Sequence, residues 1–289
     1  MTTTVIDNKP IAARLVEAPS SPPIMQALGT LARRRLTLSA RTPRELLVPL
    51  LTPILFALVI APALAKMIPH GGGVGLDYKT FVAVGTVGLL IPLSCTFAGI
   101  GVIVDRDSGA RRELLAAPVP RSLLVLSNLL VALLISGLQL VTLLVAALAR
   151  GSKFDAPASG IAWASAAALL FAIGSYGLAE VLAVGLPRQE EFIGATPAVA
   201  ILPWFLAGSL FPIAALPTGL TYFAKALPLT HALAVVRYGI LDRRGGGLHD
   251  IWGMTNLTAM AAMSLAVCAA WAGLLTFASI RLFTRSAVQ

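Results

Sequence analysis

Charged residues are scarce in this chain: only 12% of its 289 residues are Asp, Glu, Lys or Arg, whereas 57% are apolar. A soluble domain carries roughly 25% charged residues, because a compact globule must cover its surface with them. Together with a mean hydropathy of +0.85, this excludes a soluble globular enzyme and predicts a surface that mostly faces lipid. The net charge is +9, and the charged residues lie between the apolar runs. This position is typical of loops beside an anionic bilayer and not of a nucleic-acid-binding patch.

Three common kinds of functional motif are also missing. The two cysteines, Cys95 and Cys268, lie inside apolar runs and predict neither a disulfide framework nor a CxxC metal site. The histidines His70, His231 and His249 form no HExxH pair, so no metal site is expected. No G-x-x-x-x-G-K-[ST] occurs, so the chain has no loop of that kind to hold the phosphates of ATP. The sequence therefore predicts no cofactor and no catalytic residue in this chain.

Six apolar runs are long enough to cross a bilayer, which requires about 20 helical residues. They predict an all-α integral membrane protein with spans at 46–65, 80–103, 122–149, 159–186, 194–211 and 255–280. The first 23 residues are polar and lack the apolar core of a signal peptide. We therefore expect a disordered cytoplasmic tail over 1–23, followed by one transmembrane domain over 24–289.

Lysine and arginine residues in the loops predict the orientation of the spans. Five arginines between residues 33 and 44 precede the first run, and four between residues 106 and 121 follow the second. This distribution predicts that both termini lie in the cytoplasm. Three arginines run against the rule, because they would lie outside: Arg237, Arg243 and Arg244.

Two basic segments outside the spans have patterns of their own. Residues 24–44 carry apolar side chains near helical spacing and predict a helix lying on the membrane surface, although an ordinary positive-inside anchor is the alternative. In the loop 104–121 the charges alternate in sign, Gly109 permits a turn, and two helical turns fit before the next proline. Leu114 and Leu115 would then form an exposed apolar pair suited to docking on another protein. A plain charged hairpin loop is the alternative.

Prolines interrupt the apolar stretch that follows the fifth run. The segment 208–237 is too long to continue one crossing and too short for two, and it contains Pro212, Pro217 and Pro228. We expect a re-entrant helical hairpin on the outer side, provided that other helices shield the backbone groups that the breaks set free.

A few polar and aromatic residues within the runs are functional candidates. Glu180 is the only acid in the predicted spans, and such a residue marks function by default. It lies roughly 10 Å of helix from Arg188, so snorkelling or pairing in the bundle favours a structural role. Trp204, Phe205 and Phe211 would line an apolar substrate path, although aromatic residues in spans are more often lipid-facing or interfacial anchors.

In this order, the segments resemble the type-2 permease family of ABC exporters, in the style of daunorubicin-resistance and nodulation-type membrane subunits. Two motifs carry the resemblance. The loop motif consists of Asp105-Arg106-Asp107, Gly109, Glu113-Leu114-Leu115 and Pro118-Val119-Pro120-Arg121. The hairpin motif consists of Gly208, Pro212, Leu216-Pro217, Leu227 to Thr230 and Arg237. The chain departs from the family pattern at Ala110, Arg111 and Asn128, where Thr, Leu and Lys are common.

The resemblance implies the non-catalytic membrane subunit of an exporter in a prokaryotic (inner) cell membrane. The loop 104–121 is similar to a coupling helix that rests on an ATPase through Asp105, Arg106, Arg112, Glu113, Leu114 and Leu115. Two ATPase chains, which bind ATP and magnesium, and a second permease chain would complete the unit as a homodimer or heterodimer. The hairpin would help to close the exit. The expected cargo is a hydrophobic or amphipathic compound, with an antibiotic or drug first.

Other classes of function make different demands on the sequence. A permease for lipids or lipid-linked polysaccharides is the first alternative. An ion-coupled secondary transporter would need several charges inside the membrane and an internal repeat, neither of which is evident. An intramembrane hydrolase would need a base beside a nucleophile such as Ser209, and no histidine lies in another span to act as one. A structural anchor for another complex is the last alternative.

Overall fold

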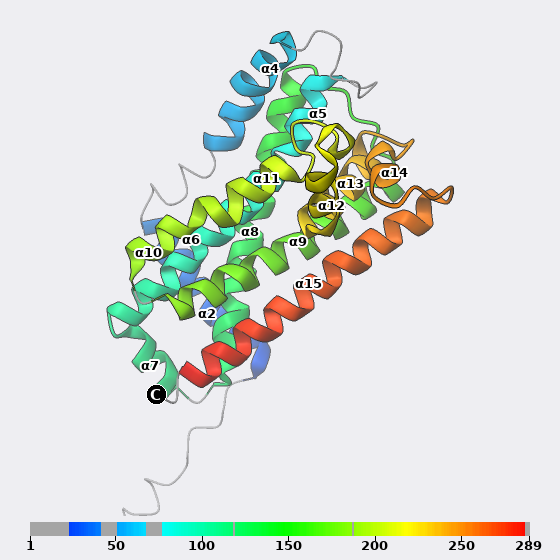
Figure 1. The fold of residues 1–289 in the computed structure, drawn as a ribbon. Coiled ribbons are helices and arrows are strands. Elements are labelled where there is room, and N and C mark those ends of the chain that lie inside the picture. Colours follow the sequence, from blue (N-terminus) through cyan, green and yellow to red (C-terminus); the bar gives the residue numbers. More distant parts are fainter. Residues whose placement is uncertain (1–22, 42–50, 68–76, 118, 187, 287–289) are drawn as a thin grey trace, which may run out of the picture.

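The computed structural model describes residues 23–41, 51–67, 77–117, 119–186 and 188–286, and all regular structure within these ranges is helical (Figure 1). This confirms the all-α prediction for the described part of the chain. Three predicted features lie wholly or partly outside the described residues. They are the tail over 1–22, the surface helix after residue 41, and the first span before residue 51.

Four helices of the described residues are long and apolar enough to cross a membrane. The second predicted span corresponds to α5 (Tyr78–Gly85) followed by α6 (Val87–Asp107). Together they form one candidate span of 30 residues. The third, fourth and sixth spans are α8 (Arg121–Ala149), α9 (Ala158–Gly185) and α15 (Leu257–Ser286). Helices of this length satisfy their own backbone groups across a hydrocarbon core. The chain is therefore a multi-pass membrane protein.

The first and fifth predicted spans are less regular. The first is a shorter apolar helix over Leu51–Lys66, which includes the π-helix η1 (Phe56–Ile60) and continues as α4 (Ala61–Met67). The fifth is divided into α10 (Gln189–Thr196), the π-helix η3 (Pro197–Ile201) and α11 (Leu202–Leu206). Pro197 and Pro203 have no backbone N–H to donate, which accounts for the change of helix type. The six-span arrangement therefore stays a prediction, and four helices of the described residues have the length and composition of spans.

The proline-interrupted segment folds as a series of short helices. In order they are the 3₁₀-helix η4 (Ile213–Ala215), α12 (Thr218–Ala226), α13 (Pro228–Ile240) and α14 (Gly246–Trp252). The axes of α12 and α13 meet at 81° around Leu227. An angle of this size belongs to a broken span or a re-entrant loop, so the predicted hairpin is one of the two arrangements that the bend allows.

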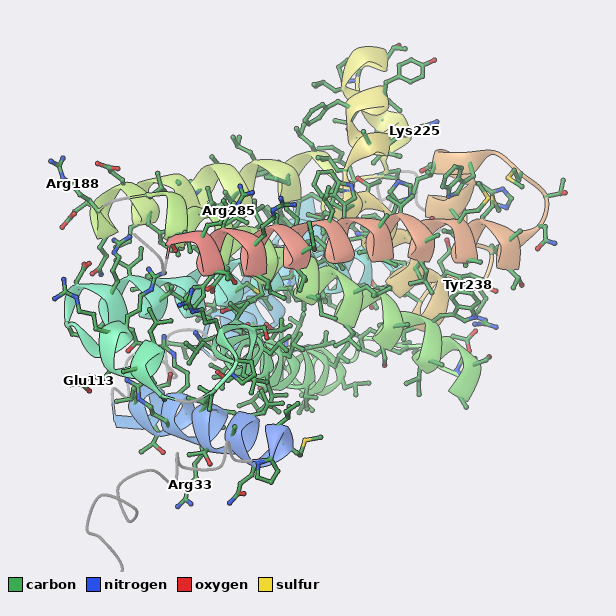
Figure 2. The ribbon with its side chains drawn as sticks, turned by 90° about the horizontal axis from the view of Figure 1, so that it is seen from below. Arg33, Glu113, Arg188, Lys225, Tyr238 and Arg285 are labelled. Carbon is green, nitrogen blue, oxygen red and sulfur yellow. The ribbon has the colours of Figure 1, made fainter. Side chains whose placement is uncertain are left out.

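Two ends of the bundle can be distinguished (Figure 1). One holds α7 (Ala110–Ala116), the beginning of α10 and the C-terminal end of α15, and we call it the α7 end. The other holds α12, α13 and α14, and we call it the α14 end. Figure 2 shows the labelled Glu113 and Arg188 at the first end, and Lys225 and Tyr238 at the second. The helix α2 (Ile24–Arg41) packs on α8. The loop motif and the hairpin motif therefore lie at opposite ends.

The helix α9 lies at the centre of the bundle, where it contacts α6, α8, α13 and α15. Its crossing with α13 depends on two glycines. A Cβ atom added at Gly160 would collide with the carbonyl oxygen of Gly239, and the reverse substitution would collide in the same way. Because the obstacle is backbone on both sides, no side chain can move aside to make room.

We predict that Gly239→Val destabilises the protein by about 1–3 kcal/mol or more, because overpacking a close helix crossing forces the backbones apart. Melting in detergent should begin several degrees lower. The matched control is Gly137→Val in the middle of α8, where an added Cβ atom meets nothing within 4 Å. Equal melting temperatures for the two variants would contradict the prediction.

Candidate functional site

The loop motif forms a turn and a short helix at the α7 end. Gly109 has a φ of 79°, in the left-handed region that glycine adopts without strain. Its carbonyl oxygen accepts a hydrogen bond from the backbone N–H of Arg112 at 2.9 Å, which begins α7. Gly109 and the two turns of α7 therefore take the form that the sequence predicts.

The two faces of α7 differ in exposure. Arg112 and Glu113 are exposed, as expected for residues that contact a partner. Leu114 and Leu115 are only half-exposed and pack against the hydrophobic core of this chain. The prediction of an exposed apolar pair is therefore wrong, because α7 lies with its leucines turned toward the bundle. The surface that α7 presents to the outside is charged.

Arg111 fastens α7 to the end of α15. Its guanidinium donates a hydrogen bond to the Ser286 hydroxyl at 2.6 Å and lies 4.6 Å from the ring centroid of Phe283. Burial lowers the pKa of Arg111, and the nearby charge of Glu180 opposes this shift. Sequence reasoning noted Arg111 only as a departure from the family pattern, because a cation in a loop between spans gives no sign of the helix that it will contact.

Two further arginines come from α2 and meet the end of α6. Arg34 and Arg35 lie 3.3 Å and 3.8 Å from the carboxylate oxygens of Asp105. Arg35 also donates a hydrogen bond to the carbonyl of Ala98 at 3.4 Å. Asp105 was expected to contact a partner, but in this chain it holds α2 against α6. Neither arginine was selected from the sequence, since both belong to a basic cluster typical of any positive-inside anchor.

Arg106 connects the end of α6 to the end of α9. Its guanidinium donates hydrogen bonds to the carbonyls of Ala183 at 3.4 Å and Leu186 at 3.2 Å, and it lies 3.1 Å from the carboxylate of Asp107. The last carbonyls of α9 have no partner within the helix, so a cation beside them is favourable. Arg106 thus has contacts within its own chain, and contact with a partner stays a prediction.

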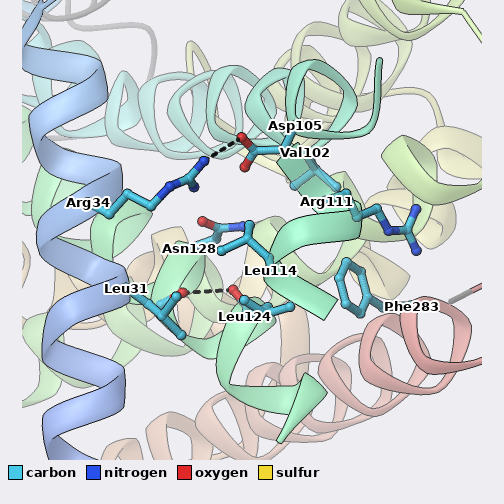
Figure 3. Close-up of a pocket in the computed structure, with 10 residues that line it drawn as sticks. Leu31, Arg34, Val102, Asp105, Arg111, Leu114, Leu124, Asn128 and Phe283 are labelled. Atoms are coloured by element: carbon cyan, nitrogen blue, oxygen red, sulfur yellow. Dashed lines mark hydrogen bonds and ion pairs between the residues drawn. The ribbon is translucent and has the colours of Figure 1, made fainter. Parts of the chain in front are cut away.

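A small pocket lies beneath α7, between α2, α6, α8 and α15 (Figure 3). Leu114 faces it with Leu31 and Phe283, and Arg34, Asp105, Ser127 and Asn128 supply its polar groups. Its volume is about 30 Å³, enough for one or two water molecules and too small for a cargo. Residues of the loop motif therefore pack closely against α2, α9 and α15.

Glu180 is fully buried in α9. One carboxylate oxygen accepts a hydrogen bond from the Tyr176 hydroxyl at 2.5 Å, and the other has no hydrogen-bond partner within the described residues. The side chain therefore pairs inside the bundle and does not snorkel to the surface. A structural role for it stays a prediction.

Arg237 holds the hairpin motif together at the α14 end. It is buried in α13 and donates hydrogen bonds to the carbonyls of Gly208 at 2.7 Å, Ser209 at 3.0 Å and Phe81 at 3.3 Å. Its guanidinium also lies 3.5 Å from the ring centroid of Phe81 in α5. One guanidinium thus donates to three carbonyls, two of which lie outside any helix. Those two belong to the segment in which the sequence predicted a broken helix.

Two neighbouring contacts also hold the backbone that follows α11 against α5. The Tyr78 hydroxyl donates to the carbonyl of Leu210 at 2.9 Å, so another carbonyl after α11 is satisfied from α5. The backbone after α11 approaches α5 closely at Gly85, where an added Cβ atom would collide with the carbonyl oxygen of Ser209. The predicted condition for a broken helix, that neighbouring helices satisfy its backbone groups, is therefore met at these positions.

The predicted path residues separate into two kinds. Trp204 is buried, donates a hydrogen bond to the carbonyl of Gly85 at 2.9 Å, and meets Phe56 edge to face with 6.0 Å between ring centroids. Phe205 and Phe211 are 45% and 37% exposed. Trp204 therefore joins α11 to η1 and α5, and only the two phenylalanines present rings to the outside. A substrate path along them stays a prediction.

The candidate nucleophile Ser209 and the possible metal ligands were also located among the described residues. The Ser209 hydroxyl is buried, and no residue in the described ranges accepts or donates a hydrogen bond to it. Across the same ranges, no three His, Cys, Asp or Glu side chains converge as metal ligands would.

Comparison with known proteins identifies the family. Residues 26–241 match the model of the ABC-2 type transporter family, which is 216 of the 289 residues. The chain belongs to this family. The match contains both the loop motif around α7 and the hairpin motif around Arg237, and it leaves out α15. The two interruptions of the bundle are therefore features of an ABC-2 transport permease.

Individual relatives agree with the family. A protein named as transport permease ycf38 from Porphyra purpurea is 23% identical over 216 residues, which cover 74% of each chain. Nodulation protein J of Sinorhizobium fredii is 27% identical over 184 residues, covering 60% of this chain and 66% of its own. A second protein named ycf38, from Pyropia yezoensis, is 24% identical over 235 residues, covering 81% of this chain and 80% of its own.

We predict that Arg237→Met strongly destabilises this permease, because it removes charged hydrogen bonds worth roughly 1.5–3 kcal/mol each and leaves buried carbonyls without a donor. A net loss of about 2–3 kcal/mol lowers the melting temperature in detergent by roughly 3–5 °C. The control is Arg244→Met, which removes an exposed arginine from the turn before α14. Arg237→Lys should lie between the two, since one ammonium cannot reach all three carbonyls. A melting temperature for Arg237→Met equal to that of the control would refute this role.

Proposed function

We propose that the chain is the membrane-spanning permease subunit of an ATP-driven ABC exporter. It moves a hydrophobic or amphipathic compound, with an antibiotic or drug first, out of the cytoplasm or the inner leaflet. The observation that carries the proposal is α7: in a chain of the ABC-2 family, a short helix with a charged outer face, Arg112 and Glu113, lies at the end of the spanning bundle.

The energy source is a separate chain. ABC-2 permeases have ABC ATPases as partners in general. The sequence has no P-loop motif for ATP phosphates, so ATP and magnesium are bound by two ATPase subunits. Two permease chains, identical or different, form the path between them. The assembly lies in a prokaryotic cell membrane, and the arginines around α2 and α7 support a cytoplasmic position for the α7 end.

The contacts of the loop supply a route for coupling. The leucines of α7 rest on the bundle, and Arg111 joins the helix to the end of α15. Arg106, at the end of the preceding helix, reaches the end of α9, while Asp105 holds α2. A displacement of α7 by the closing ATPases is therefore passed to three helices at once. ATP binding biases the permease between two arrangements because the ATPase contacts one of them better.

The hairpin at the opposite end acts as the gate. Arg237 attaches the segment after α11 to α5 and α13, so tilting of these helices moves the segment with them. Phe205 and Phe211 present exposed rings beside it, available to the cargo or to the second permease chain. Glu180 and Tyr176 lie in α9 between the two ends, where they stabilise the bundle.

We predict that Glu113→Lys uncouples transport from ATP hydrolysis, because it reverses the exposed charge that faces the ATPase. The variant should insert and melt like the wild type, since Glu113 is exposed and lies outside the core. Export by cells that co-express the ATPase should fall by at least about tenfold, which corresponds to roughly 1.4 kcal/mol of lost contact. The measurements are export of a fluorescent amphipathic compound and ATP hydrolysis in vesicles that contain both subunits.

The matched control is Glu190→Lys, which reverses another exposed acid at the start of α10. It changes the net charge by the same amount without touching α7. Unchanged export by Glu113→Lys would remove α7 from the mechanism. An equal loss in the control would show that net charge alone, and not the α7 contact, is responsible.

A further inference from the structure

A cavity of about 210 Å³ lies on one side of α9, between α11 and α15. Its wall comes from five parts of the chain, namely α6, α9, η3 with α11, the bend between α12 and α13, and α15. The lining residues used in the argument below are Phe171, Ser175, Leu178, Pro228, Cys268 and Trp271. We call this cavity the α9 groove. It exceeds the roughly 150 Å³ of an apolar protein cavity that accommodates benzene, so it has room for several methylene groups.

The α9 groove is apolar and opens toward lipid. Ser175, Cys268 and the indole of Trp271 carry the only polar side-chain atoms of its wall, and the Cys268 thiol donates to the carbonyl of Pro228 at 3.5 Å. Trp271 at its rim is 40% exposed, and the nearby Leu202 and Leu274 are 60% and 61% exposed. In helices that span a membrane, exposed apolar surface of this kind faces hydrocarbon. The groove is therefore a side opening of the bundle within the bilayer.

An alkyl chain suits this groove better than water does. A buried water needs two to four polar partners, and the wall offers almost none. Lipid tails surround the spans, and burying each methylene group in an apolar site is favourable where it replaces an unfilled void. The groove also lies against the bend at Leu227, where the axes of α12 and α13 differ by 81°. An alkyl chain in the groove therefore fills the space beside that bend.

A basic residue lies next to the wall of the groove. Residues Ala226 to Leu229 form part of this wall, and Lys225 in the last turn of α12 directly precedes them in the chain. No carboxylate of the described residues lies within ion-pair distance of the Lys225 ammonium. Asp250 of α14 is near: burial raises its pKa, and the charge of Lys225 opposes that shift. Lysines at a bilayer surface attract lipid phosphates by roughly 1 kcal/mol each.

We propose that the α9 groove binds one acyl chain of an anionic phospholipid, whose phosphate is held by Lys225. The lipid braces the bend between α12 and α13 against α9 and α15. This site lies within a single permease chain and does not depend on the proposed cargo or on the ATPase. Its test therefore stands apart from the export measurements.

The test uses photolabelling of the full chain in phosphatidylcholine vesicles. A small fraction of phosphatidylglycerol carries a diazirine halfway along one acyl chain, and labelled peptides are identified by mass spectrometry after irradiation. Labels should be enriched about fivefold on Phe171–Leu178 and Cys268–Leu275 relative to the exposed α8 residues Leu134, Leu138 and Val141, as a preference of roughly 1 kcal/mol requires. Equal labelling of both regions overturns the proposal.

Two variants with a matched control separate the groove from the general lipid surface. Ser175→Phe fills the groove and should reduce its labelling to the level of α8. Ser165→Phe makes the same change ten residues earlier on an exposed position of α9 and should leave the labelling unchanged. Lys225→Gln should lower labelling by phosphatidylglycerol about fivefold, but not labelling by a diazirine-bearing diacylglycerol, which has no phosphate. Unchanged labelling in Ser175→Phe or in Lys225→Gln contradicts the proposed site.

A second measurement needs no substitution in the groove. Cys268 is 1% exposed and lines the groove, so a bound chain should shield it from N-ethylmaleimide. The reaction at Cys268 should be faster in vesicles of phosphatidylcholine alone than in vesicles that also contain phosphatidylglycerol. A rate that is independent of lipid overturns the proposal even if Ser175→Phe fails to fold.

Discussion

A bilayer has no water to satisfy backbone N–H and C=O groups, so each break in a spanning helix must find its partners within the protein. The segment after α11 breaks in this way, and the buried guanidinium of Arg237 donates to the carbonyls of Gly208 and Ser209. The same side chain reaches Phe81 of α5, so satisfying the break also joins α13 to a neighbouring span. The fold at the α14 end follows from this one cation, which is why its burial in an apolar protein is tolerated.

At the α7 end, several arginines also find their hydrogen-bond and ion-pair partners within the protein. Arg106 donates to the last carbonyls of α9, Arg111 to Ser286 of α15, and Arg34 pairs with Asp105. Each contact joins two helices, so the loop between α6 and α8 is connected to most of the bundle. Between the two ends the spans are mostly apolar and closely packed. The arginine contacts are therefore concentrated at the two ends of the bundle.

Periodicity and run length predicted four of the spans correctly, because an apolar run of about 20 residues has few stable alternatives in a bilayer. The first and fifth runs showed the limit of that rule. Composition predicted a span at 194–211, but the helix there changes type from Pro197 and ends at Leu206. Gly109 and the end of α7 were also predictable, since a positive φ and a following proline are local properties.

The side-chain partners could not be predicted. Leu114 and Leu115 looked like an exposed pair beside charged residues, and only packing against the core decided their direction. Arg111 looked like an ordinary basic loop residue, and Arg34 and Arg35 like part of a positive-inside anchor. In the structure Arg111 contacts α15, whereas Arg34 and Arg35 both contact Asp105 of α6. By itself the sequence determined the class of the protein, its apolar spans and the positions of its interruptions, because these depend on local composition. Only the tertiary structure decided which cation meets which hydrogen-bond acceptor, because such contacts join residues as far as 175 positions apart.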